Sequence, residues 1–182
     1  MSGLLIVING PIGAGKSAVA QALAGTFRQQ GVAAAVIDLD VLYLMVDGNK
    51  PMASTSAWLR ARRAAAALTD AFFSSGVDVV IVEGPFWNRE ERVLFVDRLT
   101  CGVRPRFVTL LVSYDEALRR VQGDLTRGIS RDPAFLKWEH ANFQTTLEPL
   151  KSTDIIFDSS DQTPHQIATA IAKAVARAPT AD

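Results

Sequence analysis

Short apolar runs alternate along the chain with longer segments in which apolar residues recur every three or four positions. The short runs are rich in Val, Ile and Leu and are bounded by glycine or polar residues, which is typical of buried strands. They lie at 4–8, 32–37, 79–82, 107–112 and 155–157. The longer segments predict helices over about 17–31, 41–46, 54–73, 89–99, 114–121, 134–148 and from 164 onward. This alternation predicts an α/β domain in which helices cover both faces of a five-stranded parallel sheet.

The segment from Gly10 to Ser17 follows the first strand and opens the first helix. It reads GPIGAGKS and matches the pattern G-x-x-x-x-G-K-[ST] without a gap. In this pattern glycines let successive backbone N–H groups converge on an anion, and the helix start adds the positive end of its dipole. A glycine-rich turn with an incidental Lys-Ser is the alternative, and the strand and helix on either side disfavour it.

The same motif predicts a nucleoside triphosphate site with ATP and Mg²⁺ as cofactors. We expect Lys16 to reach the β- and γ-phosphates and the Ser17 hydroxyl to bind Mg²⁺. The residues expected to contact the nucleotide here are Gly10, Ile12, Gly13, Ala14, Gly15, Lys16, Ser17 and Ala18.

Composition narrows the remaining possibilities. The 182 residues suit one domain spanning 1–182, and 19 basic residues balance 19 acidic ones, so bulk charge suggests neither a nucleic-acid nor a membrane partner. A single cysteine, Cys101, excludes an internal disulfide and fits a reducing compartment. No apolar run approaches the roughly 20 residues of a membrane span. We therefore expect a cytoplasmic protein that acts as a monomer or a homodimer.

Acidic residues follow the second and third predicted strands, where ligands of parallel sheets bind. Asp38 and Asp40 close the second strand, so one can direct Mg²⁺ while the other orients or deprotonates a substrate hydroxyl. We favour Asp40 for the hydroxyl and Asp38 for the metal, although an Asp that caps the next helix is the alternative. Glu83 ends the third strand and is expected to bind Mg²⁺ or the acceptor, unless it only pairs with an arginine.

The polar segment at about 122–133 contains Arg127 and Arg131, together with glycines that permit movement. Phosphoryl transfer requires positive charge beside the transferring group, and a hinged lid supplies it while excluding water. The alternative is a solvated basic loop. Because the phosphate-binding motif lies in the same chain, we expect Arg127 and Arg131 to be catalytic.

Together these features resemble the small P-loop kinases, the group that includes shikimate kinase, gluconate kinase, adenylylsulfate kinase and chloramphenicol phosphotransferase. The resemblance rests on Gly10 to Ser17, on the strand end Asp38-Leu39-Asp40, and on the arginine-bearing segment before Asp132-Pro133. It implies a sheet of strand order 2-3-1-4-5 and a short mobile lid.

The resemblance also implies roles for individual residues. Asp40 matches the proposed base of chloramphenicol phosphotransferases, Arg120 would lie near the adenine, and Ser160 would lie against the nucleotide base. The sequence Glu83-Gly84-Pro85-Phe86-Trp87 stands where shikimate kinases carry a glycine triplet, so a shikimate-like acceptor is not expected.

Aromatic residues and arginines suggest the acceptor pocket. Phe86 and neighbouring aromatic residues would form apolar walls, and Arg62, on or beside the exposed face of its helix, would bind an anionic acceptor. Packing alone is the alternative for the aromatics, as is solvation for most of the nearby arginines. His140 falls on the apolar stripe of its helix, so we expect a partly buried histidine with a hydrogen-bond partner and no catalytic role.

The sequence thus predicts an ATP-dependent kinase that phosphorylates a hydroxyl of a small metabolite or antibiotic. A nucleoside or nucleoside monophosphate acceptor remains an alternative. A non-catalytic nucleotide-binding regulatory protein is a second one, although a pure binder needs no acidic strand ends opposite an arginine lid.

Overall fold

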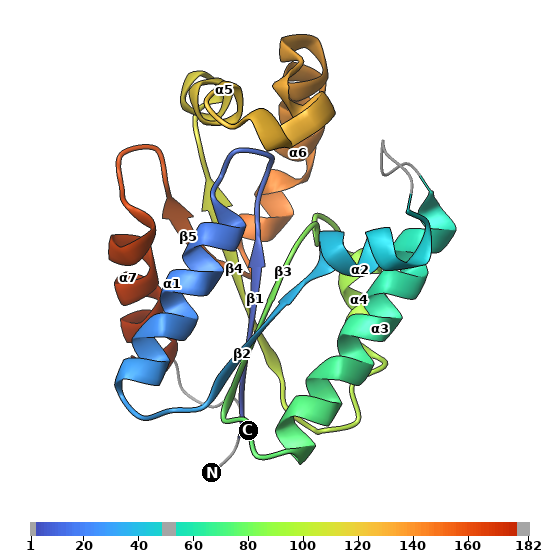
Figure 1. Cartoon of the computed structure of the whole chain (residues 1–182), viewed down its shortest axis with the longest axis vertical. Helices are drawn as coiled ribbons and strands as arrows, with labels where there is room; N and C mark the ends of the chain where they lie inside the picture. Colours follow the sequence, from blue (N-terminus) through green and yellow to red (C-terminus); the bar gives the residue numbers. More distant parts are fainter. Residues whose placement is uncertain (1–2, 49–53, 178–182) are drawn as a thin grey trace.

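A five-stranded sheet runs through the centre of the molecule (Figure 1). The computed structural model describes residues 3–48 and 54–177. All four strand pairs are parallel, and the spatial order is β2-β3-β1-β4-β5, so the predicted sheet and strand order are confirmed. The strands are β1 (Leu4–Asn9), β2 (Ala34–Asp38), β3 (Val79–Glu83), β4 (Pro105–Leu111) and β5 (Ile155–Asp158).

Helices cover both faces of the sheet and its carboxyl edge (Figure 1). Helices α1 and α7 lie on one face, and α3 and α4 lie on the other, while α5, the 3-10 segment η1 and the start of α6 stand above the carboxyl ends of the strands. The helical elements are α1 (Lys16–Gln29), α2 (Leu39–Val46), α3 (Thr55–Ser74), α4 (Arg89–Val96), α5 (Tyr114–Gln122), η1 (Leu125–Arg131), α6 (Pro133–Lys151) and α7 (Pro164–Arg177).

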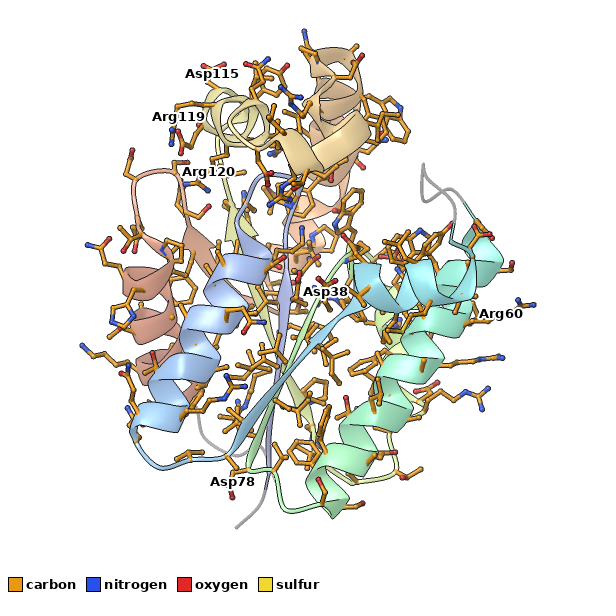
Figure 2. The ribbon with its side chains drawn as sticks, viewed as in Figure 1. Asp38, Arg60, Asp78, Asp115, Arg119 and Arg120 are labelled. Atoms are coloured by element: carbon orange, nitrogen blue, oxygen red, sulfur yellow. The ribbon has the colours of Figure 1, made fainter. Side chains whose placement is uncertain are left out.

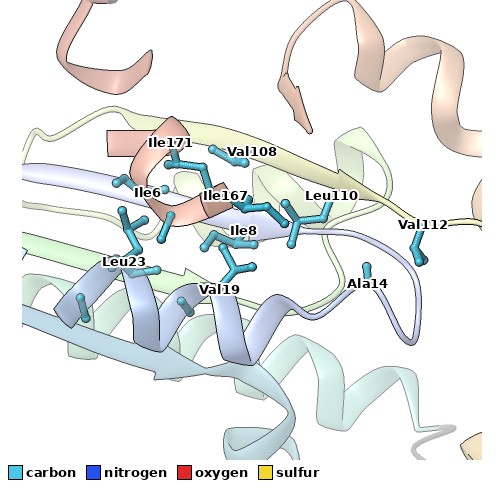
Figure 3. Packing of buried hydrophobic residues seen from close by; sticks show 14 of the residues in the cluster. Ile6, Ile8, Ala14, Val19, Leu23, Val108, Leu110, Val112, Ile167 and Ile171 are labelled. Atoms are coloured by element: carbon cyan, nitrogen blue, oxygen red, sulfur yellow. The ribbon is translucent and has the colours of Figure 1, made fainter. Parts of the chain in front are cut away.

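Side chains of β1 divide between two hydrophobic clusters because successive residues of a strand point to opposite faces. Ile6 and Ile8 pack with α1 and α7, as Figure 3 shows, whereas Leu5 and Val7 pack against α3 and α4. All four side chains are fully buried. The two-sided apolar strands seen in the sequence therefore have the covered sheet that they require.

Several element boundaries differ from those predicted from sequence. Helix α2 begins at Leu39 instead of Val41, because the Asp38 side chain caps it by accepting from the N–H groups of Asp40 and Val41. Within the polar segment at 122–133, the 3-10 segment η1 occupies Leu125–Arg131 with a break at Gly128. Across 3–48 and 54–177, no helix has the length and apolar character to cross a membrane.

Candidate functional site

The loop from Gly10 to Ser17 joins β1 to α1 in a conformation that depends on glycine. Gly15 is the N-cap of α1 with a left-handed backbone (φ 84°), and Gly13 has φ 81°. A Cβ at Gly13 would lie 2.7 Å from the Ala117 Cβ of α5, so the loop passes too close to α5 for any side chain. Lys16 Nζ donates to the carbonyls of Gly10 (2.9 Å) and Pro11 (3.1 Å), which holds the ammonium over the loop. This shape and charge fit a polyphosphate.

Carboxylates from β2 and β3 lie beside this loop. Asp38 and Glu83 are register partners at the ends of the two adjacent strands. Glu83 is 3% exposed and accepts a hydrogen bond from the Ser17 hydroxyl. Burial raises the pKa of Glu83 to about 7; the Lys16 charge opposes this rise, whereas the negative charges of Asp38 and Asp40 add to it. The structure therefore brings together the lysine, the serine and the three acids that the sequence analysis selected.

Asp38 has a structural role in addition to its place in this cluster. Its Oδ1 accepts from the N–H of Asp40 at 2.8 Å and of Val41 at 3.2 Å, so the capping role considered above applies to Asp38. Figure 2 shows Asp38 where β2 passes into α2. Asp40 lies half-buried in the first turn of α2, and the cap uses its backbone N–H instead of its carboxylate.

A cavity of about 640 Å³ opens on the other flank of the phosphate-binding loop. Its walls come from the loop, α1, α5, η1 and the turn between β5 and α7. The lining residues include Gly13, Ala14, Gly15, Ala18, Arg120, Arg127, Ser160 and Asp161. The structure thus places Arg120, Arg127 and Ser160 in one cavity with the loop, as the nucleotide-site prediction requires.

Arg120 uses every N–H of its guanidinium to hold this cavity together. Its Nε donates to Glu116 at 2.7 Å, and Nη1 donates to the Gly13 carbonyl (3.0 Å) and to the Ser159 hydroxyl (3.2 Å). Its Nη2 donates to the carbonyls of Ser159 and Ser160. Hydrogen bonds from Arg119 and Arg120 hold the pKa of Glu116 at about 2. Arg120 therefore joins the loop to the β5–α7 turn, and only its planar face is left for a ligand.

The two lid arginines occupy different environments. Arg127 lines the cavity, is 46% exposed at its side chain and pairs with Asp124 at 3.1 Å. Arg131 is half-buried and donates to the Gln122 carbonyl at 3.5 Å, while its buried Nε has no hydrogen-bond partner among the described residues. An unpaired buried N–H is costly, so Arg131 retains capacity for an acceptor from a ligand or a moved lid.

Helix α6 supplies two contacts to the loop, one of which the sequence analysis missed. The Ile12 N–H donates to the Glu139 carboxylate, at 3.1 Å from Oε1 and 3.2 Å from Oε2. His140 Nε2 lies 2.9 Å from the Ile12 carbonyl and therefore carries the proton that it donates. His140 has the predicted hydrogen-bond partner, but it is buried more completely than the partly buried histidine that was expected. The missed signal was the position of Glu139, three residues after Leu136 on the same apolar stripe.

Glu139 is 4% exposed, and its surroundings bear on its charge. Burial raises the pKa of Glu139 to about 7, while the charge of Lys16 and the hydrogen bond from Ile12 lower it. Burial also lowers the pKa of His140, which favours the neutral imidazole.

Two residues assigned to the acceptor pocket lie elsewhere than expected. Phe86 is fully buried and packs edge-on against Phe95 and Phe107, so it belongs to the core behind the site. Arg62 is 4% exposed and does not lie on the exposed face of α3, because it bonds the Pro85 carbonyl and Glu91, both at 2.9 Å. The neighbouring Arg60 points outward from α3 (Figure 2).

Arg62 nevertheless lines a second cavity, of about 590 Å³, between α3 and α4. The other lining residues are Thr55, Ser56, Trp58, Leu59, Asn88, Glu90, Glu91 and Leu94. This surface mixes hydroxyl, amide and carboxylate groups with an indole ring.

No group of three or more His, Cys, Asp and Glu side chains that would by itself hold a metal ion occurs in 3–48 and 54–177. Mg²⁺ commonly takes one or two protein oxygen ligands together with substrate phosphates and water. Ser17 and Glu83, which lie in contact, suit that mode of binding.

Comparisons with known proteins agree with this architecture. The sequence profile of a family described as "AAA domain" matches residues 5–141. No curated protein matches the chain in a sequence comparison.

Solved structures share the fold at low sequence identity. A sugar kinase from Janibacter sp. HTCC2649 has a TM-score of 0.69 and 20% identity, covering 97% of this chain and 96% of its own. The Mycobacterium tuberculosis APS kinase in complex with AMPPNP and APS has a TM-score of 0.66 and 15% identity, covering 96% and 98%. The tunicamycin resistance protein of Deinococcus radiodurans has a TM-score of 0.63 and 17% identity, covering 95% of each chain. The fold resemblance to small P-loop kinases is therefore confirmed.

Proposed function

This chain belongs to the AAA domain family, and we propose that it is an ATP-dependent phosphotransferase acting on a hydroxyl group of a small molecule. The observation that carries the proposal is one cluster at the carboxyl edge of the sheet. There the phosphate-binding loop, with Lys16 and Ser17, faces the carboxylates that end β2 and β3, while Arg127 lines the adjoining cavity. A protein that only bound nucleotide would not need both the acids and the lid.

In this proposal the charge of each side chain determines its role. Lys16 and the loop amides hold the phosphates, while Ser17 and Glu83, with Asp38 beside them, hold Mg²⁺. When bound, MgATP supplies the phosphoryl group and neutralises part of its charge. Asp40 orients the acceptor hydroxyl or takes its proton, and Arg127 and Arg131 stabilise negative charge on the transferring group.

For the acceptor we propose a small polar alcohol, either a metabolite or an antibiotic. The cavity beside Arg62 supports this choice, since hydroxyl and amide groups there can bind sugar-like hydroxyls while Trp58 covers an apolar ring face. The fold accommodates such chemistry, because proteins named as a sugar kinase and a tunicamycin resistance protein share it.

Replacing Lys16 is the most direct test. Lys16→Ala should lower kcat/KM by about 100- to 1,000-fold, because it removes a preorganised positive charge from the phosphates. ADP release against a panel of sugars, antibiotics, nucleosides and nucleoside monophosphates would measure it, and Lys137→Ala on the exposed side of α6 is the control. Full phosphotransfer by Lys16→Ala would refute the mechanism. A strict requirement for a nucleobase in the acceptor would favour the nucleoside alternative, and tight ATP binding without transfer to any acceptor would favour a regulatory protein.

Replacing Asp40 or Asp38 with Asn distinguishes the roles of the two residues. Asp40→Asn should lower kcat about 100-fold and leave ATP affinity nearly unchanged, as expected for a group that handles the acceptor proton. Asp38→Asn keeps the cap of α2, since Asn caps as well as Asp, and should instead raise the Mg²⁺ concentration needed for half-maximal activity. Titrations of ATP and Mg²⁺ measure both effects. If instead Asp38→Asn lowered kcat and Asp40→Asn raised the Mg²⁺ requirement, Asp38 would handle the acceptor proton and Asp40 would direct the metal.

A further inference from the structure

Helix α6 bonds both backbone polar groups of Ile12, its N–H and its carbonyl. The Glu139 carboxylate accepts from its N–H, and His140 donates to its carbonyl. Both side chains are more than nine-tenths buried, although they come from a helix 127 and 128 residues further along the chain. These hydrogen bonds are thus a built contact between α6 and the phosphate-binding loop.

Ile12 is among the loop residues that the sequence predicts to contact the nucleotide, and its N–H is one of the backbone donors of this loop. A loop of this type binds negatively charged oxygens through its N–H groups. In this structure the Glu139 carboxyl already accepts a hydrogen bond from the Ile12 N–H, and it also interacts with the charge of Lys16. Glu139 therefore makes the two interactions, with a loop amide and with the lysine, that a phosphate oxygen would make.

We propose that Glu139 is a positioning residue that occupies the place of a nucleotide phosphate on the loop and is displaced when ATP binds. This inference rests on the proposed function, because it takes the loop to be an ATP site. The inference goes further than that function, because it identifies a side chain of the protein itself, Glu139, as a competitor of ATP for the site. Without nucleotide, the Glu139 carboxylate accepts from the Ile12 N–H and balances the charge of Lys16. Both interactions must break before the phosphates can bind there.

Electrostatics makes this competition dependent on the protonation of Glu139. The titratable groups that face Glu139 are Lys16 from the loop and His140 from its own helix, 4.0 Å away. Glu83 approaches Lys16 from β3 on the sheet side. Because the pKa of Glu139 is raised to about 7, its carboxyl is largely neutral at pH 6 and largely ionised at pH 8. Only the ionised form repels a triphosphate, so the competition grows as the pH rises.

Isothermal titration of the full chain with MgATP tests the proposal. Glu139→Gln keeps the size of the side chain and removes its charge, so it should bind MgATP about tenfold more tightly than the wild type at pH 8. At pH 6 the two proteins should differ less than about twofold, because the wild-type carboxyl is then largely protonated. Comparing the proteins at each pH cancels the titration of ATP itself. Glu148→Gln, an exposed position on the same helix, is the matched control and should match the wild type at both pH values.

Hydrogen exchange of the Ile12 amide supplies a readout that does not need the nucleotide. The amide should exchange more quickly in Glu139→Ala than in the wild type, while amides of β1 and β4 stay protected and report an intact fold. Equal MgATP affinity of the wild type and Glu139→Gln at pH 8, or weaker binding by the variant, would overturn this proposal alone. Failure of both proteins to bind MgATP would overturn it together with the proposed function.

Discussion

Two helices bond neighbouring residues of the phosphate-binding loop, one at a backbone carbonyl and the other at a backbone N–H. Arg120 of α5 donates to the Gly13 carbonyl, which leaves the loop N–H groups available to an anion. Glu139 of α6 accepts from the Ile12 N–H and so uses a group of the kind that the anion needs. The first contact shapes the loop for its ligand, whereas the second is in competition with that ligand. The phosphate-binding loop can therefore be ordered in the absence of nucleotide, and it must still exchange its bond to Glu139 for one to a phosphate when nucleotide binds.

Removing the α5 contact should have the largest effect. Arg120→Ala leaves the carbonyls of Gly13, Ser159 and Ser160 without their donor, so the free energy of unfolding should fall by about 4 kcal/mol. ATP affinity should fall about tenfold or more, because the cavity loses its preorganisation. Urea denaturation and calorimetry measure the two effects. Arg119→Ala is the control: it shares Glu116 but is 73% exposed, and a loss as large as that of Arg120→Ala would show that Glu116 alone matters.

Removing the charge of the α6 contact should stabilise the protein at alkaline pH. The pKa of Glu139 is higher in the folded chain (about 7) than in the unfolded chain (about 4.5), so the folded state binds the proton more tightly. That contribution is fully present below about pH 4.5 and is lost as the pH rises through about 7. The free energy of unfolding of Glu139→Gln should therefore exceed that of the wild type by up to about 3 kcal/mol at pH 8.

The measurement is urea denaturation between pH 5 and pH 8, with Glu148→Gln as the control. If the free-energy difference between Glu139→Gln and the wild type shrinks as the pH rises, the ionised Glu139 stabilises the fold. The distinction drawn between the Arg120 contact and the Glu139 contact would then be wrong.

Replacing the second α6 contact should have the smallest effect. His140→Phe keeps an aromatic ring against Tyr114 but removes the donor to the Ile12 carbonyl, so it should cost about 1 to 2 kcal/mol. His140→Gln can retain a donor and should recover part of the loss. Thermal denaturation compares them, with His165→Gln on the exposed start of α7 as control. No loss in His140→Phe would leave Glu139 as the sole functional contact from α6.

The sequence predicted the features whose signal is local. The GPIGAGKS motif lies between a strand and a helix, so the residue pattern alone was enough to place the loop and the acidic strand ends, whereas the sheet order was implied only by the resemblance to small P-loop kinases. Glu139 could not be placed in this way, because its partner Ile12 is 127 residues away and neither residue type indicates the contact. An aromatic residue after a strand, such as Phe86, suits a pocket wall and the core equally well, so only the burial seen in the structure decides its place. The burial of Arg62 within α3 depends on its bonds to Pro85 and Glu91, which are distant in sequence and could not be predicted.

The lid is joined to α6 without a spare residue. Asp132 closes η1 through its backbone N–H and opens α6 through its side chain, which accepts from Ala134 and Phe135. Because Asp132 belongs to both caps, a rotation of α6 that withdraws Glu139 from the loop would also move Arg131, whereas Arg127 lies beyond the break at Gly128. Binding of a triphosphate at the loop would then be coupled to a movement of Arg131 in the lid.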